Sequence, residues 1–187
     1  MDESITTLNT PPIRLRTLRA SDEAAIAALL EQGQPLVGSM PVPALTPHTV
    51  KAEYFDHPPN HLWVAEVDDL VVGLAGLVHE QPMVARLQLL YIDSDWDAAD
   101  VAEPLLQTAV RHCHYFGYLK LVAPAVWPTD ELLALFSRCG LRFTRHREAG
   151  GHLPCVLEFY VDLYRRGGDA TVMATANTEA EQAGSVR

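Results

Sequence analysis

Residues 86–106 constrain the fold more than any other segment, because they combine a strand, a tight turn and the start of a helix (RLQLLYIDSDWDAADVAEPLL). The part from Arg86 to Ile92 is largely apolar, as expected of a buried strand. Such a strand-to-helix junction commonly binds phosphate, since free backbone N–H groups and the positive end of the helix dipole point there. Four acidic side chains that would repel an anion occupy this junction, namely Asp93, Asp95, Asp97 and Asp100. The segment therefore has the geometry of a phosphate site without its charge.

Composition limits the class of protein and its partners. The chain has 187 residues, 48% of them hydrophobic and 20% charged, which is typical of one globular domain with a proper core. A net charge of −10 argues against nucleic acid as a partner and, more weakly, against a membrane surface. The three cysteines lack metal-site spacing, and no signal segment or membrane-spanning run is visible, so we expect a cytoplasmic protein without a metal site.

The order of elements predicts a mixed α/β (α+β) fold. Apolar alternation and turn residues predict seven strands, at 13–18, 62–67, 70–79, 86–92, 120–125, 141–147 and 155–163. Helical periodicity and capping residues predict four helices, at 21–32, 46–55, 100–116 and 129–138. Glycines and prolines predict a loop over 33–43. We expect a flexible N-terminus (1–11), one domain (12–164) and a disordered C-terminal tail (165–187), with about seven strands in a central sheet and helices on both faces.

Over residues 12–164 this order resembles the GNAT superfamily of acyl-CoA-dependent N-acyltransferases. Leu90-Tyr91-Ile92 matches the family's strand end, and Leu105-Leu106 matches its paired leucines at the expected distance. A second match is Leu135-Phe136-Ser137-Arg138-Cys139-Gly140-Leu141. The resemblance implies that acetyl-CoA or another acyl-CoA lies where the strands at 86–92 and 119–125, adjacent and parallel, splay at their C-terminal ends. It also implies an amine acceptor, either a small molecule or a peptide.

The resemblance also implies which residues form the site. Backbone groups of Leu90, Tyr91 and Ile92 would bind the pantetheine amides. The pyrophosphate loop falls on Asp97, Ala98, Ala99, Asp100, Val101 and Ala102. Thr129 stands where the family often has asparagine, and Phe136 stands where many members have a tyrosine general acid. Glu80 and Tyr91 lie beside the central strands and are the remaining catalytic candidates.

Departures from the family pattern leave two hypotheses. The family's arginine falls on Asp97 and its first strict glycine on Asp100, and Phe136 has no proton to give. A carboxylate ~5 Å from a phosphate costs on the order of 3 kcal/mol at an effective dielectric near 20. One hypothesis is an N-acyltransferase with weak or altered cofactor use. The other is a non-catalytic GNAT-fold module for binding or assembly that has lost CoA pyrophosphate binding. Both are compatible with a homodimer.

Several residues have alternative interpretations. The acidic turn alternatively provides a helix cap, from Asp97 or Asp100, and it lacks the spacing of a calcium-binding EF-hand. His112 and His114 point in different directions on a helix and cannot share one ion. His57, His61 and Glu66 are candidates for a base near a substrate cleft, with ordinary surface or structural roles as the default.

Overall fold

The computed structural model describes residues 12–37, 46–126, 128–147 and 156–163. The predictions for residues 1–11 and 165–187 lie outside these ranges. Along the chain the elements are β1 (Arg14–Thr17), η1 (Ala20–Asp22), α1 (Glu23–Gln32), β2 (Gln34–Val37), α2 (Pro47–Phe55), β3 (His61–Val67), β4 (Leu70–Gln81), β5 (Val84–Ile92), α3 (Ala98–Tyr115), β6 (Lys120–Val126), α4 (Asp130–Arg138), β7 (Arg142–Arg147) and β8 (Val156–Asp162). No helix in the described ranges is long and apolar enough to cross a membrane.

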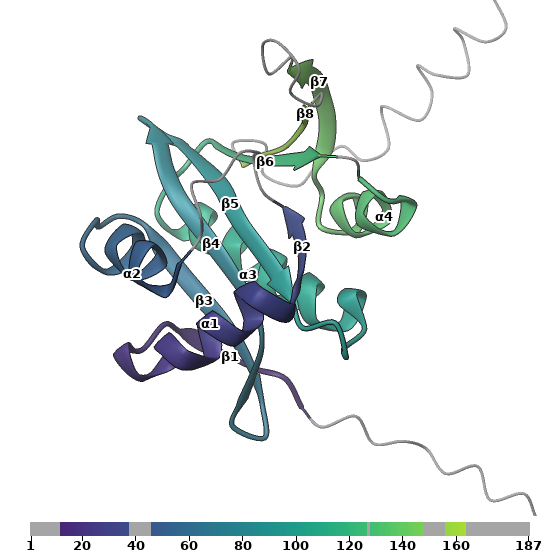
Figure 1. Ribbon diagram of the computed structural model, residues 1–187. Coiled ribbons are helices and arrows are strands. Elements are labelled where there is room, and N and C mark those ends of the chain that lie inside the picture. Colours follow the sequence, from purple (N-terminus) through teal and green to yellow (C-terminus); the bar gives the residue numbers. More distant parts are fainter. Residues whose placement is uncertain (1–11, 38–45, 127, 148–155, 164–187) are drawn as a thin grey trace, which may run out of the picture.

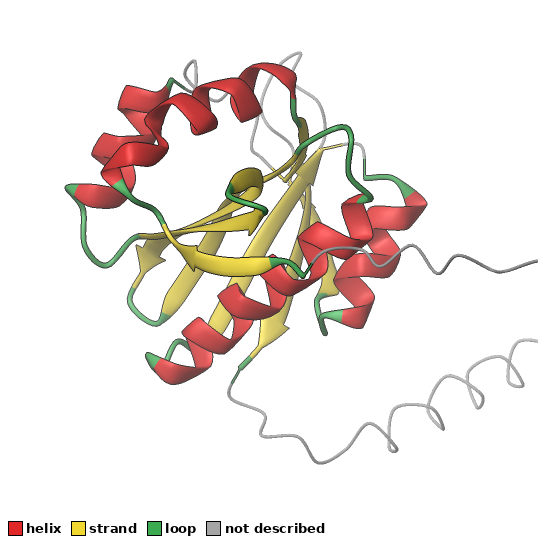
Figure 2. Ribbon diagram, turned by 90° about the horizontal axis from the view of Figure 1, so that it is seen from below, coloured by secondary structure: helices red, strands yellow, loops and turns green. Residues whose placement is uncertain are grey.

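One eight-stranded sheet organises the molecule (Figure 1). Its strand order is β1-β3-β4-β5-β6-β8-β7, and β2 pairs with β5 off this path. The pair β5–β6 is parallel, and the other pairs are antiparallel. Helices cover both faces of the sheet (Figure 2). The predicted mixed α/β fold is confirmed, with one strand more than expected, because β2 forms inside the segment 33–43 that was predicted as a loop.

Two apolar cores lie on opposite faces of the sheet. One packs the sheet against α1 and α2, and it includes Ile26, Leu29, Val50, Tyr54 and Leu89. The larger core packs the other face against α3 and α4, and it includes Leu87, Leu90, Val101, Leu105 and Phe136. Burial of these side chains on both faces is the main source of stability.

Glycines on β4 allow helices to approach the sheet closely from both faces. A Cβ on Gly73 would lie 2.6 Å from a Val101 methyl carbon of α3, and one on Gly76 would lie 2.2 Å from the Tyr54 hydroxyl of α2. Both glycines therefore permit close packing of a helix against the sheet. The strands predicted at 62–67 and 70–79 form the β3–β4 hairpin, and Asp68 and Asp69 turn it with φ of 47° and 65°.

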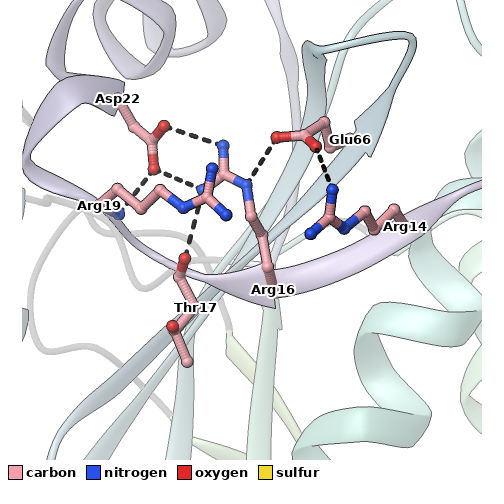
Figure 3. A network of polar contacts seen from close by, with 6 residues as sticks. All are labelled: Arg14, Arg16, Thr17, Arg19, Asp22 and Glu66. Atoms are coloured by element: carbon pink, nitrogen blue, oxygen red, sulfur yellow. Dashed lines mark hydrogen bonds and ion pairs between the residues drawn. The ribbon is translucent and has the colours of Figure 1, made fainter.

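An ion-pair network fastens β1 to its neighbours (Figure 3). The Arg16 guanidinium donates to Glu66 at 2.6 Å and to the two Asp22 carboxylate oxygens at 2.7 and 2.9 Å. The Arg19 backbone N–H donates to Asp22 at 2.7 Å. Hydrogen bonds from Arg16 hold the pKa of Asp22 below its usual value. Glu66 lies on β3, two strands from β5, and is held by Arg16 in a structural role.

Candidate active site

The parallel strands β5 and β6 separate soon after they begin. They pair over three positions only, Val84↔Lys120, Ala85↔Leu121 and Arg86↔Val122. Beyond Val122, β6 stays paired with β8, while β5 continues to Ile92 along β4. We call this separation beyond Arg86 and Val122 the split. The predicted arrangement of adjacent, parallel and splayed strands is confirmed.

A β-bulge in β5 stands at the start of the split. Opposite Gly76 and Leu77 of β4, the register jumps from Leu89 to Leu87, so Gln88 is an extra residue in β5. A bulge bends its strand and increases the local twist, which directs the rest of β5 away from β6. It also shifts the alternation of side chains, so that Leu87 and Leu90 enter the α3 core while Leu89 enters the α1/α2 core. This shift explains the nearly continuous apolar run in the sequence.

Strand β2 occupies the edge of β5 that β6 leaves. It pairs antiparallel with the end of β5 in the register Gln34↔Ile92, Pro35↔Tyr91 and Val37↔Leu90. It also contacts β6, and Figure 1 shows it beside β5 on the side of β6. The predicted loop over 33–43 is therefore wrong at 34–37. Local composition favours a turn there, but the unpaired edge of β5 provides a partner that local sequence does not reveal.

The acidic turn leads into α3 and caps it. Asp97 is the N-cap, and its carboxylate accepts a hydrogen bond from the Ala99 N–H at 2.8 Å. The prediction that Asp97 or Asp100 caps the helix is confirmed for Asp97, although α3 begins at Ala98 rather than at 100. Three N–H groups of the first turn lack helical acceptors, those of Ala98, Ala99 and Asp100. Asp97 itself uses one of them.

The N-terminus of α3 is strongly negative. Asp95, Asp97 and Asp100 are exposed, and none of them forms an ion pair with any described residue. Glu103 is bound by Arg138 of α4 at 2.8 Å, and this pair joins the two helices. Val101 and Ala102, which complete the predicted loop, lie inside α3 with fully buried side chains. Among the described residues, no group of three or more side chains is arranged to hold a metal ion.

Helix α4 places Phe136 in the core. Thr129 is the N-cap, and its hydroxyl accepts from the Leu132 N–H at 3.2 Å. Gly140, at φ 81°, follows the end of the helix, where a left-handed conformation favours glycine. Phe136 is fully buried, and its ring lies 5.0 Å from that of Phe159. The position that the resemblance assigned to an acid therefore contributes packing.

Glu80 and Tyr91, the two catalytic candidates, are not brought together. Glu80 lies near the end of β4 and forms an ion pair with Arg86. Tyr91 lies near the other end of β5, opposite Pro35, and packs against the α1/α2 core. Burial raises the pKa of Tyr91 above its ordinary value.

A histidine and aromatic cluster that the sequence did not predict lies between β3 and the C-terminal end of α3. The ring centroids of His61 and His112 are 4.1 Å apart, and Trp63 and Phe116 pack against them. Burial, and then the neighbouring His61, lower the pKa of His112 to about 4. The cluster is two strands away from β5, so His61 is not placed as a base at the split.

Comparisons with known proteins agree with this geometry. The profile of the acetyltransferase (GNAT) domain matches residues 29–149. The ribosomal-protein-S18-alanine N-acetyltransferase of Escherichia coli has a TM-score of 0.67 and 11% identity, covering 84% of this chain and 98% of that one. An acetyltransferase of Bacillus subtilis in complex with CoA has a TM-score of 0.61 and 14% identity, covering 81% and 99%. A spermidine N-acetyltransferase chimera of the Vibrio cholerae and human enzymes has a TM-score of 0.63 and 15% identity, covering 81% and 95%. These structures share the fold, and no curated protein sequence matches the chain.

Proposed function

The chain belongs to the GNAT acetyltransferase family, and we propose that it transfers an acyl group from acyl-CoA to an amine. The observation that carries this proposal is the split beside the bulge at Gln88, which leaves the end of β5 free of β6. Strand backbone at such a point can bind the amides of an extended pantetheine arm. The CoA complex of an acetyltransferase with the same fold supports acyl-CoA as the cosubstrate.

The chemistry of direct amine attack requires few side chains. Backbone groups of Leu90–Ile92 orient the thioester and stabilise the oxyanion that forms when the amine attacks. When the tetrahedral intermediate collapses and the C–S bond breaks, Tyr91 donates its phenolic proton to the leaving thiolate, and the proton that the amine loses returns to the Tyr91 oxygen through water. We assign this role to Tyr91 rather than to Glu80, whose carboxylate is already paired with Arg86 near the other end of β5. The loop that corresponds to the pyrophosphate site (97–102) binds the diphosphate of acyl-CoA weakly, because Asp97 and Asp100 repel it.

The acceptor is an amine, and two relatives indicate which amines to test first. One relative is named for the alanine of a ribosomal protein, and another for spermidine. The test is release of the CoA thiol from acetyl-CoA in the presence of spermidine, of a peptide with N-terminal alanine and of a lysine peptide. We expect amine-dependent release with at least one of them. Absence of both acetyl-CoA binding and turnover would refute the proposal.

The role of Tyr91 has its own test. Tyr91→Phe should lower kcat by about 100-fold or more with little effect on KM, since proton transfer by a side chain typically contributes 10²–10⁴-fold. Tyr118→Phe is the matched control, because burial also raises the pKa of Tyr118. Its hydroxyl lies beside His79 near the end of β4, away from Leu74, the β4 partner of Tyr91. An equal loss of kcat in both variants would mean that Tyr91 supports the fold and does not transfer a proton.

A non-catalytic GNAT-fold module is the second candidate. Two observations favour it: Asp97 uses an N–H group that a phosphate would need, and Phe136 is a packed core residue. This candidate predicts that acetyl-CoA does not bind even after the acidic side chains of the 97–102 loop are neutralised. The experiment that opens the Discussion separates the two candidates.

A further inference from the structure

The edge of β5 that faces β6 is divided between two strands. Backbone N–H and C=O groups of a strand point alternately to its two edges, and β4 takes one edge of β5 along nearly its whole length. On the other edge, β6 pairs with residues 84–86 and β2 pairs with residues 90–92. In the proposed function, the backbone N–H and C=O groups of Leu90–Ile92 bind the pantetheine arm. These groups are already paired within the chain.

We propose that β2 occupies the acyl-CoA slot, by which we mean the edge of Leu90–Ile92 that faces the split. We propose further that β2 leaves β5 when the pantetheine arm of acyl-CoA binds there. The inference rests on the proposed function, since it takes the end of β5 as the pantetheine site. Two ligands that use the same backbone groups cannot bind at once. Acyl-CoA binding is therefore coupled to release of residues 34–37.

The pairing of β2 is weak enough to be exchanged. Pro35 has no N–H to donate, and Leu36 is an extra residue that interrupts the register with β5. Gln34 and Pro35 are exposed, and Leu36 is half-buried. In contrast, β4 pairs with β5 through an almost continuous ladder and carries core residues on both faces. The competing ligand therefore displaces β2 rather than β4.

Two residues hold β2 in place, and substituting them tests the proposal. Val37 is fully buried in the α3/α4 core, so it is the apolar anchor of the strand. Gly33 connects α1 to β2, and a Cβ there would lie 2.4 Å from the Leu29 carbonyl oxygen and 3.0 Å from that of Ile92. Both neighbours are backbone atoms. An alanine at position 33 must therefore shift the chain away from β5.

Release of β2 should appear as tighter binding of the cosubstrate. When a binding-competent state has a fractional population, the apparent Kd equals the intrinsic Kd divided by that fraction. If β2 is docked in about 99% of molecules, full release tightens binding about 100-fold. We therefore expect Val37→Ala and Gly33→Ala to tighten binding at least tenfold.

Val72→Ala is the matched control for Val37→Ala. Both valines are almost fully buried in the same core, at 0% and 1% exposure, but Val72 belongs to β4. The control loses the same atoms and should leave affinity unchanged, although it also lowers the melting temperature. Calorimetry uses acetyl-CoA and S-acetylpantetheine as probes. The second probe lacks the diphosphate, so its affinity depends on the slot and not on repulsion by the acidic start of α3.

Hydrogen exchange on the wild-type protein gives a direct readout. With saturating S-acetylpantetheine, peptides covering 34–37 should exchange faster, while peptides covering 88–92 stay protected. Binding that leaves 34–37 protected would overturn the proposal and leave the acyltransferase function standing. Equal affinity of wild type and both β2 variants would also overturn it. If neither probe binds any of these proteins, the proposed function fails together with the inference.

Discussion

Neutralising the start of α3 should raise the affinity for acetyl-CoA if the charge there is the obstacle. The change is Asp97→Asn together with Asp100→Asn. Asparagine is as good an N-cap as aspartate, so the hydrogen bond to the Ala99 N–H is retained and the helix keeps its start. The loss of Asp100 from the first turn weakens the helix by about 0.3–1 kcal/mol through the macrodipole. The fold therefore survives a change that removes two negative charges.

The size of the effect follows from exposure. At ~5 Å, a pair of unit charges interacts by about 3 kcal/mol at an effective dielectric near 20, and by about 0.8 kcal/mol in bulk water. Both aspartates are exposed and make no ion pair with the described residues, so the lower value is closer. Two such repulsions amount to about 2 kcal/mol, or roughly a 15- to 30-fold gain in affinity for a diphosphate.

Calorimetry at two salt concentrations tests this reasoning. The gain should be present for acetyl-CoA, absent for S-acetylpantetheine, and smaller at 0.5 M than at 0.05 M salt, because screening shortens the range of the repulsion. Asp97→Ala is the control for the cap, and it should lower stability by about 1 kcal/mol. A gain that is equal for both ligands, or no gain for acetyl-CoA, would refute the electrostatic argument.

Three further predictions concern stability. Because Arg16 lowers the pKa of Asp22 below 3.8, this stabilisation is present above that pH and is lost as the pH falls through the lowered value. The melting temperature of Asp22→Asn should therefore be lower than that of the wild type at pH 7 and should decline less steeply below pH 4. Parallel plots of melting temperature against pH would contradict the linkage. The pKa of His112 is lowered from 6.5 to about 4, so stability should fall as the pH drops between these values, and His112→Phe should flatten that decline in thermal denaturation at several pH values. The buried Tyr54 hydroxyl has no hydrogen-bond partner among the described residues, so Tyr54→Phe should be neutral or stabilising by about 1 kcal/mol, whereas Gly76→Ala, which brings a Cβ against that hydroxyl, should destabilise; urea unfolding measures both.

Local sequence signals were sufficient for the elements that carry their own start and stop residues. The helices predicted at 46–55 and 129–138 form as α2 and α4: Thr46 with Pro47 begins α2, Thr129 begins α4 and Gly140 follows its end. The strand-helix-strand unit from 86 to 125 predicted the parallel pair, because a right-handed crossover leaves few alternatives, and the family resemblance implied its splay. These signals depend on neighbours in sequence, which is why they can be read without the fold.

Features that depend on distant partners could not be predicted in the same way. β2 forms because the end of β5 has a free edge, and Gln34, Pro35 and Leu36 give no sign of a strand on their own. The position of the β5 bulge at Gln88 follows from its register with β4. The network around Arg16 joins residues 50 positions apart. Of the candidate site, the sequence indicated the acidic loop and the substitution at Phe136, but not the pairing of β2 with the end of β5.

The acidic start of α3 and the docked β2 hinder different parts of acyl-CoA, and this separation determines how they combine. Asp97 and Asp100 lie at the start of α3, where the proposed function places the diphosphate, whereas β2 pairs with the part of β5 that it assigns to the pantetheine arm. Effects of distant sites that share no partner add in free energy. Val37→Ala combined with the two asparagine substitutions should therefore multiply the separate gains in acetyl-CoA affinity, while S-acetylpantetheine responds to Val37→Ala alone. A combined gain no larger than either single gain would mean that one conformational change underlies both. In that case the loop at 93–97 and β2 would move together, through the segment of β5 that joins them.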